Sequence, residues 1–247
     1  MLNTIEHGEV LEIRMNRPPA NALNVEMVDS IASAHASACV QGAQAIILSG
    51  LPGMFSGGLD VPELLQLDRT AINRFWTAFL SLMTSLAGSS VPVVAAITGH
   101  SPAGGAVLAV HCDYRVSAAG SFKIGFNEVR VGLPVPRTIL LALERLVGGR
   151  RAAQLATSGL LLSPEQARDC GLVDELAEPD AVVQQALAWA QQTISLPPIA
   201  MNRTRLLAKD KFLQELKAAD DADVATDYWF SEETQAAMQG LVENLRK

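Results

Sequence analysis

The chain has 247 residues, 49% hydrophobic and 18% charged, so it can bury a sizeable globular core. Its formal net charge of −7 argues against binding nucleic acid or an anionic membrane through a general positive field. The three cysteines, Cys39, Cys112 and Cys170, are odd in number and widely spaced, which predicts a reducing, cytoplasmic compartment and no metal site. The N-terminal residues lack the apolar core of a signal peptide, and no apolar stretch is long enough to predict a transmembrane helix.

The first part of the chain alternates between predicted strands and helices. Val10–Met15 and Ala45–Ser49 have the pattern of strands, and Asn24 is placed to cap a helix between them. His35 lies on the apolar stripe of that helix, so we interpret it as a packed core histidine rather than a ligand. A glycine-rich loop over Gly50–Asp60 follows. It leads to helices predicted near Val61 and over Ala71–Leu86.

The central stretch, Val93–Ser117, is predicted to be a buried strand, a tight turn, a buried helix and a second strand. Val93–Ile97 is continuously apolar, Thr98–Ala103 contains Gly, Ser and Pro, and Gly104–Val110 is apolar all round. The first turn of such a helix presents unpaired N–H groups, and glycine allows close approach to the backbone. We therefore expect this turn to receive a negatively charged or polarised oxygen.

Other known glycine motifs fit this stretch poorly. In a phosphate-binding P-loop a lysine follows the second glycine, but here Gly105 occupies that position. Gly99-His100-Ser101 begins like a serine nucleophile elbow, yet the next residue, Pro102, has no N–H to hold an oxyanion. A glycine turn that only packs a buried helix remains an open alternative.

The second part of the chain is mainly helical. A short strand is predicted within Phe122–Gly125, and Asn127–Pro136 is predicted to be a loop with an extended middle. The double proline Pro197-Pro198 is the best candidate for a boundary, and the chain beyond it has a helical pattern. Helices before that boundary are predicted over Arg137–Val147, Arg150–Ser158, Pro164–Asp169 and Pro179–Ile194. The pattern predicts an α/β core with a helical extension whose apolar stripe packs on the core or forms an oligomer.

Four stretches, taken in order, resemble the crotonase (enoyl-CoA hydratase/isomerase) superfamily: Asn16–Asn24, Met54–Asp60, Pro102–Val116 and Ile124–Leu133. Within that superfamily the chain is most similar to the mitochondrial-type 3,2-trans-enoyl-CoA isomerases. The resemblance implies an α/β fold, a crotonase-like spiral of β-β-α units over residues 1–196. It also implies a helical C-terminal oligomerisation region over residues 197–247, with a homotrimer or a dimer of trimers as the assembly.

The resemblance also implies a site for an acyl-CoA thioester. In the family, two backbone N–H groups hold the thioester oxygen, and by motif these belong to Leu59 and Gly104. Substrate binding is assigned in the same way to Gly104 and to the second glycine turn, which comprises Ser56, Gly57, Gly58, Leu59 and Asp60. Asp60 is also placed to cap the helix that follows. CoA is then part of the substrate, and no separate cofactor or metal is expected.

The reaction depends on carboxylates. Hydratases of the family use two glutamates; here the first position is Val107 and the second is Glu128. A single base suffices to move a proton from one carbon to another, so the resemblance favours isomerisation of 3-enoyl-CoA to trans-2-enoyl-CoA in fatty-acid β-oxidation. Phe126, Val129 and Val131 are candidates for an apolar wall that would raise the pKa of Glu128.

Three other points stay open from the sequence. The chain can be a hydratase or another acyl-CoA enzyme of this fold, or a non-catalytic binding or scaffold member, with RNA disfavoured by the net charge. No basic cluster is dedicated to the CoA phosphates. Lys209, Lys211, Arg14 and Arg17 are candidates, although each is more typical of a solvated surface charge.

Overall fold

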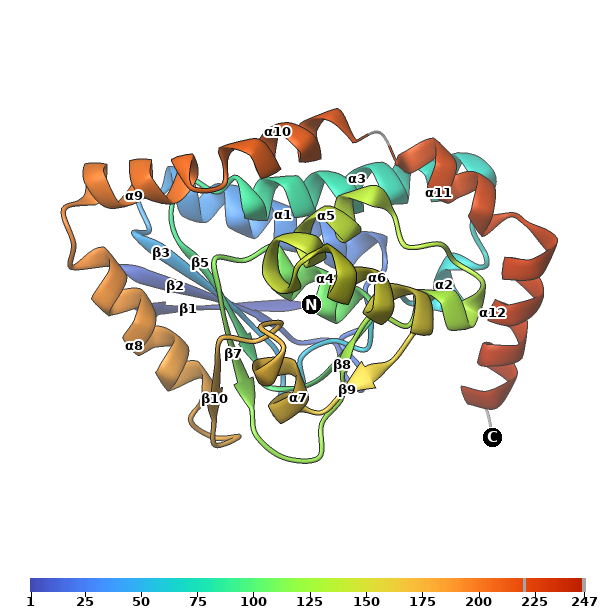
Figure 1. The fold of residues 1–247 in the computed structure, drawn as a ribbon, viewed down its shortest axis with the longest axis horizontal. Helices are drawn as coiled ribbons and strands as arrows, with labels where there is room; N and C mark the ends of the chain where they lie inside the picture. The colour runs from blue at the N-terminus through green and yellow to red at the C-terminus, as the bar shows by residue number, and fades with distance from the viewer. Residues whose placement is uncertain (220, 246–247) are drawn as a thin grey trace.

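A six-stranded sheet, in the order β1-β2-β3-β5-β7-β10, supports the fold in the computed structural model, which describes residues 1–219 and 221–245 (Figure 1). Only the β1–β2 pair is antiparallel; the other neighbours are parallel. The strands are β1 (Leu2–His7), β2 (Val10–Met15), β3 (Ala45–Ser49), β5 (Val93–Ile97), β7 (Tyr114–Ala118) and β10 (Glu175–Ala177). Three of them, β2, β3 and β5, have the bounds that their apolar patterns predict.

A second sheet consists of four short strands in the order β4-β6-β8-β9. Three of them directly follow central strands of the first sheet along the chain. The four strands are β4 (Gly53–Met54), β6 (Gly99–Pro102), β8 (Ile124–Gly125) and β9 (Leu161–Leu162). Thus β3 leads to β4, β5 to β6 and β7 to β8, and each pair is followed by helical turns. This is the expected spiral of β-β-α units.

The sequence predicted only a turn at Thr98–Ala103, and that prediction missed β6. Gly99 pairs with Gly53 in a contact so close that a Cβ on Gly99 would lie 2.0 Å from the Gly53 carbonyl carbon. Glycines therefore make this strand pairing possible, although along the sequence they read as interruptions.

Most predicted helices are present with small shifts in their ends. The helices that precede the double proline are α1 (Val25–Val40), α2 (Val61–Leu64), α3 (Arg69–Ala87), α4 (Gly104–Val110), α5 (Arg137–Val147), α6 (Gly149–Ser158), α7 (Pro164–Asp169) and α8 (Val182–Ile194). Asn24 caps α1 as predicted, because its side chain accepts a hydrogen bond of 2.9 Å from the Met27 N–H.

The predicted extended segment after Asn127 is instead a 3-10 turn, η1 (Glu128–Val131). The Arg130 N–H donates to the Asn127 carbonyl, and the Gly132 N–H donates to the Val129 carbonyl. Gly132 has φ +73°, a left-handed conformation that ends the turn. This turn fixes the direction in which Glu128 leaves the backbone.

The helices after the double proline follow the top of the molecule as drawn in Figure 1, and the last of them turns down its right-hand side. They are α9 (Pro198–Leu207), α10 (Asp210–Ala218), α11 (Ala222–Trp229) and α12 (Glu232–Leu245). Helix α10 contacts α3 and α5, α11 contacts α3, and α12 contacts η1 and α2. The extension therefore packs on the rest of the chain, while its role in oligomerisation stays a prediction.

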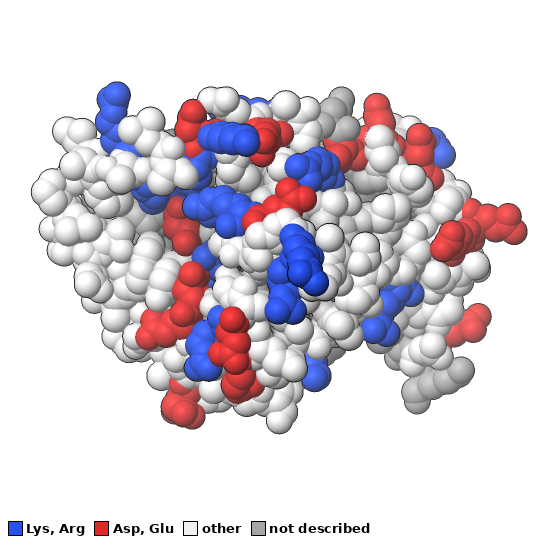
Figure 2. All heavy atoms as spheres, viewed as in Figure 1, with Lys and Arg blue, Asp and Glu red and all other residues white. Residues whose placement is uncertain are grey.

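The surface carries both signs of charge. On the face drawn in Figure 2, acidic and basic side chains are interspersed, and no continuous basic field covers it. In the part of the chain that the structure describes, no helix combines the length and the apolar character needed to cross a bilayer.

Candidate active site

Two glycine turns, one before α2 and one before α4, lie directly against each other. A Cβ on Gly104 would come within 2.9 Å of Leu23 Cδ1 and 3.2 Å of Gly58 Cα. A Cβ on Gly105 would lie 2.6 Å from the Ser56 carbonyl oxygen. The absence of side chains at Gly104 and Gly105 therefore allows the two turns to pack together, and the expected approach of a ligand to this backbone stays a prediction.

The loop before α1 holds the first turn in place. The Leu23 N–H donates to the Gly58 carbonyl at 2.8 Å, and the Asp60 N–H donates to the Leu23 carbonyl at 3.0 Å. These two bonds form a parallel bridge around Leu59, whose own N–H has no hydrogen-bond partner among the described residues. The N–H of Gly104 is likewise unpaired within that part of the chain. Two free backbone donors thus follow two turns in contact.

Ala103, immediately before α4, has an unusual backbone conformation. Its φ is +45° and its ψ is −119°, values that a residue with a Cβ rarely adopts. The Ala103 N–H donates to the Gly125 carbonyl at 2.8 Å, which ties this residue to β8. Strained residues of this kind persist where the surroundings hold them, often beside functional sites.

Beside these turns lies a cavity of about 210 Å³. Its walls come from both glycine turns and from α2, α3, α4, η1, α5 and α12. The residues that line it are mostly apolar: Gly57, Leu59, Val61, Pro62, Trp76, Phe79, Pro102, Ala103, Gly104, Val107, Asn127, Glu128, Val131, Leu133, Pro134, Pro136, Ile139 and Leu241. Glu128 is the one ionisable side chain among the described residues that line the cavity.

Glu128 is buried, with 8% of its surface exposed, and its Oε2 has no hydrogen-bond partner in the described structure. Burial disfavours the charged carboxylate and raises the pKa of Glu128 to about 7. Such a pKa suits a group that both takes up and releases a proton near neutrality. Trp76 Nε1 and Asn127 Oδ1, from two other lining residues, are also buried without partners.

The apolar wall near Glu128 differs in part from the one predicted. Val131 lines the cavity, but Phe126 is buried in the core and Val129 is 38% exposed. Other apolar lining residues come from distant helices and were not predicted: Trp76, Phe79, Ile139 and Leu241. No sequence pattern indicated these contacts, because each of these residues fits the ordinary apolar stripe of its helix.

Helix α12 supports the turn that carries Glu128. Thr234 Oγ1 donates a hydrogen bond of 2.7 Å to the Gly132 carbonyl, directly after η1. A Cβ on Gly132 would lie only 2.9 Å from Thr234 Cα, so the two segments are in close contact. The Leu133 N–H donates in turn to the Glu128 carbonyl. The C-terminal extension thus contacts the segment directly after the turn that carries the candidate base, Glu128.

Of the predicted site residues, Gly57, Leu59, Gly104 and Glu128 share the cavity, and Val107 lies there as well. Ser56, Gly58 and Asp60 are outside its lining, and their roles in substrate binding stay predictions. Ser56 Oγ donates to the Asn21 carbonyl and accepts from the Gly58 N–H, so Ser56 supports the turn.

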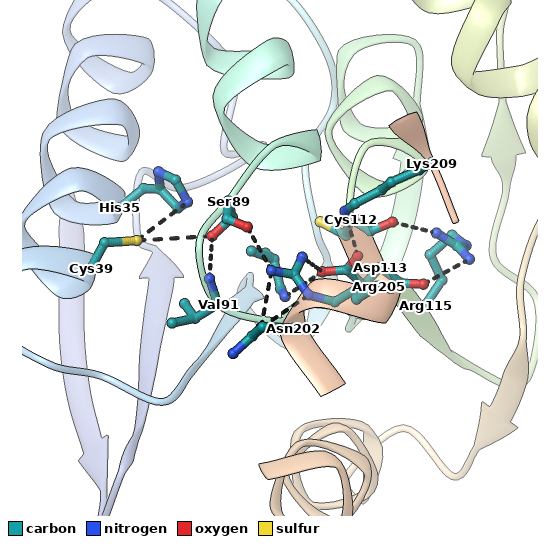
Figure 3. A network of polar contacts seen from close by, with 11 residues as sticks. His35, Cys39, Ser89, Val91, Cys112, Asp113, Arg115, Asn202, Arg205 and Lys209 are labelled. Carbon is teal, nitrogen blue, oxygen red and sulfur yellow. Dashed lines mark hydrogen bonds and ion pairs between the residues drawn. The ribbon is translucent and has the colours of Figure 1, made fainter. Parts of the chain in front are cut away.

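Asp60 caps α2, as the sequence predicted, by accepting a hydrogen bond from the Glu63 N–H at 3.1 Å. It also forms a 2.6 Å ion pair with Arg17. Arg14 pairs with Glu12, and Lys211 lies near Glu215 on the surface. Lys209, the fourth candidate for the CoA phosphates, is buried in an ion pair with Asp113 (Figure 3). Their assignment to CoA stays a prediction.

Comparisons with known proteins agree on one family. A family model described as "Enoyl-CoA hydratase/isomerase" matches residues 6–247. The chain is 30% identical to human mitochondrial enoyl-CoA delta isomerase 1 over 96% of its own length and 80% of that protein. It is 33% identical to a probable enoyl-CoA hydratase, EchA17, of Mycobacterium tuberculosis over 76% of this chain and 72% of that one.

The fold agrees as well. The crystal structure of human mitochondrial delta3-delta2-enoyl-CoA isomerase superposes with a TM-score of 0.93 at 28% identity, covering 99% of this chain and 98% of that one. The match over nearly the whole chain, in sequence and in fold, shows that this chain belongs to the enoyl-CoA hydratase/isomerase family.

Proposed function

We propose that this protein is an isomerase that shifts the double bond of a 3-enoyl-CoA to the trans-2 position. The observation that carries the proposal is the lone ionisable group of the cavity, Glu128, beside two turns with free backbone N–H groups. The similarity to the human isomerase supports the same reaction.

The chemistry needs one base and one oxyanion site. The Glu128 carboxylate takes a proton from C2 of the substrate, and the electron pair of the broken C–H bond moves towards the thioester oxygen. The Leu59 and Gly104 N–H groups stabilise the resulting enolate; losing one such donor costs about 2.7–4 kcal/mol in a comparable enzyme. Protonated Glu128 then returns the proton at C4, so the double bond moves from between C3 and C4 to between C2 and C3. CoA is part of the substrate, so the proton balance closes without a cofactor.

Val107 supports isomerisation over hydration. It is fully buried and lines the same cavity, at the position where the resemblance places the first glutamate of hydratases. An aliphatic side chain cannot activate a water molecule or deliver a proton. Hydration with Glu128 alone is the second candidate function, favoured by the similarity to the probable hydratase EchA17.

The proposed assembly is a homotrimer or a dimer of trimers, with fatty-acid β-oxidation in the cytoplasm as the setting. Helix α9 supports an assembly because none of its residues is fully buried, and Ile199 and Leu207 are 83% and 64% exposed. Light scattering on the eluting protein during size-exclusion chromatography tests this part. A monomer at micromolar concentration would contradict it.

An assay with purified protein tests the reaction. With 3-hexenoyl-CoA we expect the ultraviolet absorption of the conjugated 2-enoyl thioester to appear. With trans-2-hexenoyl-CoA we expect little loss of that absorption, because hydration is slow or absent. Comparable rates with the two substrates would favour the hydratase. Calorimetric binding of butanoyl-CoA without turnover of either substrate would favour a non-catalytic binding protein.

A further inference from the structure

Two aromatic side chains form part of the lining of the cavity. Trp76 and Phe79, on one face of α3, both line the cavity and are 3% and 1% exposed. Leu241 of α12 lines it as well. Apolar walls of this kind bind the hydrocarbon part of a ligand rather than its polar CoA portion.

The aromatic wall is held in place from behind. The ring centroid of Trp76 lies 5.7 Å from that of Phe75, 5.9 Å from that of Phe79 and 6.3 Å from that of Trp229. The Trp76 contacts with Phe75, Phe79 and Trp229 are all edge-on, and Phe75 and Phe79 are stacked on each other. A side chain with rings on several sides cannot turn away without moving its neighbours, since interiors are close-packed.

The cavity volume indicates the size of an acyl group that fits inside it. A protein cavity of about 150 Å³ accommodates benzene, which has six carbons. By the same ratio, the 210 Å³ found here accommodates about eight carbons. The reacting unit from the thioester carbonyl to C4 already takes four of them, so about four more carbons fit beyond it.

We propose that Trp76 is a specificity-determining residue that limits the substrate to acyl groups of about six to eight carbons. The inference rests on the proposed function, because it places the acyl chain of the substrate in this cavity. Trp76 does not touch the reacting atoms; its side chain closes the space that the acyl tail occupies. Leu241 forms a second part of the same limit from the C-terminal extension.

Binding of saturated acyl-CoAs, measured by calorimetry, tests the limit without requiring turnover. We expect the affinity to rise from butanoyl- to octanoyl-CoA and to fall at least tenfold for dodecanoyl-CoA. A steady rise through dodecanoyl- and hexadecanoyl-CoA would overturn the proposal. If binding shows the limit but no 3-enoyl-CoA is turned over, the proposed reaction fails while the size limit stands.

Matched variants test whether Trp76 sets the longest acyl chain that the cavity binds. Trp76→Leu should shift the maximum of affinity to dodecanoyl-CoA or longer, because it removes the larger part of the wall. Phe75→Leu is the control: Phe75 belongs to the same aromatic cluster, but it does not line the cavity. We expect it to leave the maximum at octanoyl-CoA.

Leu241→Ala provides a second route to the same result, since Leu241 is only partly buried and its truncation disturbs the core less. If Trp76→Leu does not fold, Leu241→Ala alone should still raise the affinity for dodecanoyl-CoA at least fivefold. An unchanged chain-length profile in every folded variant would overturn the assignment to this wall.

Discussion

The polar network of Figure 3 and the cavity each hold a carboxylate with little exposed surface, and the surroundings of the two carboxylates differ. In the network of Figure 3, Asp113 accepts hydrogen bonds from the Val93 N–H at 2.9 Å, from Arg205 at 2.9 Å and from Lys209 at 2.6 Å. In the cavity, Oε2 of Glu128 has no partner among the described residues, and burial raises the pKa of Glu128 to about 7.

Asp113 is thus a structural carboxylate, whereas Glu128 is the proposed reactive carboxylate. Asp113 joins the start of β5 to α9 and to the start of α10, so its partners come from segments far apart in the sequence. Donors to both oxygens satisfy the hydrogen-bonding capacity of the Asp113 carboxylate, which suits a structural role. Oε2 of Glu128 has no such partner among the described residues, and a pKa near neutrality is what a proton-transfer step requires.

The largest expected effect comes from removing the reactive carboxylate. Glu128→Gln keeps the size of the side chain but cannot transfer a proton, so we expect kcat to fall by about 10²–10⁴-fold. The measurement is the appearance of conjugated 2-enoyl thioester from 3-hexenoyl-CoA. Glu144→Gln, which breaks an exposed ion pair with Arg137, is the matched control and should be nearly neutral. Full activity in Glu128→Gln would place the base elsewhere.

Removing the structural carboxylate should affect stability instead. Asp113→Ala leaves the buried cations of Lys209 and Arg205 without their anion, and loss of one partner of a buried pair costs about 3–5 kcal/mol. Urea unfolding measures this loss in the free energy of unfolding. In the folded fraction we expect KM to stay unchanged. A variant as stable as the parent would mean that the network contributes little to the fold.

The pH dependence should reveal the reactive carboxylate directly. The kcat/KM for isomerisation should rise about tenfold per pH unit below 7 and level off above it, since the base acts in its ionised form. A profile that is flat between pH 5 and pH 8 would contradict the raised pKa of Glu128.

The same raised pKa has a consequence for stability. Between the ordinary glutamate pKa of about 4.3 and the folded value of about 7, the folded protein holds one more proton than the unfolded chain. The contribution of this group to the free energy of unfolding is therefore present at low pH and is lost as the pH rises through this window, by about 4 kcal/mol in total. Glu128→Gln does not titrate, so its stability relative to the parent should grow between pH 4.5 and pH 8 in urea unfolding. A constant difference would contradict the burial of the charge.

The smallest expected effect concerns the support beneath the reactive carboxylate. Gly132→Ala places a Cβ 2.9 Å from Thr234 Cα and at φ +73°, so we expect a loss of about 1–3 kcal/mol in the free energy of unfolding. Gly8→Ala is the control, because Gly8 also has a positive φ, +66°, but open space around it. Equal losses in the two variants would show that α12 does not press on η1.

The parts of the fold that the sequence predicted well are those specified locally. Continuous apolar runs at Ala45–Ser49 and Val93–Ile97 define two central strands with their bounds, and Asn24 defines the start of α1. In the second sheet, β8 lies within the short strand predicted over Phe122–Gly125. The other three strands, β4, β6 and β9, were missed because they are two to four residues long and pair with segments distant in sequence. No local pattern encodes a pairing such as that of Gly53 with Gly99.

The candidate site divides in the same way. The family motifs brought Leu59, Gly104, Val107 and Glu128 to one cavity, which local sequence alone would not have done. The aromatic wall was missed because Trp76 lies on an ordinary amphipathic helix and its place at the cavity follows from packing. The 3-10 turn at Glu128 was also missed, since it depends on the left-handed Gly132 and on α12 beyond it.

The contact of α12 with the cavity has a consequence for the order in which the protein becomes complete. During synthesis Glu128 and both glycine turns leave the ribosome well before Thr234 and Leu241, which brace the turn of Glu128 and line the cavity. A nascent chain that stops short of α12 therefore holds its acid group on an unbraced turn, beside a pocket that lacks one side. Catalytic competence is expected to arrive late in biosynthesis, with the docking of this helix.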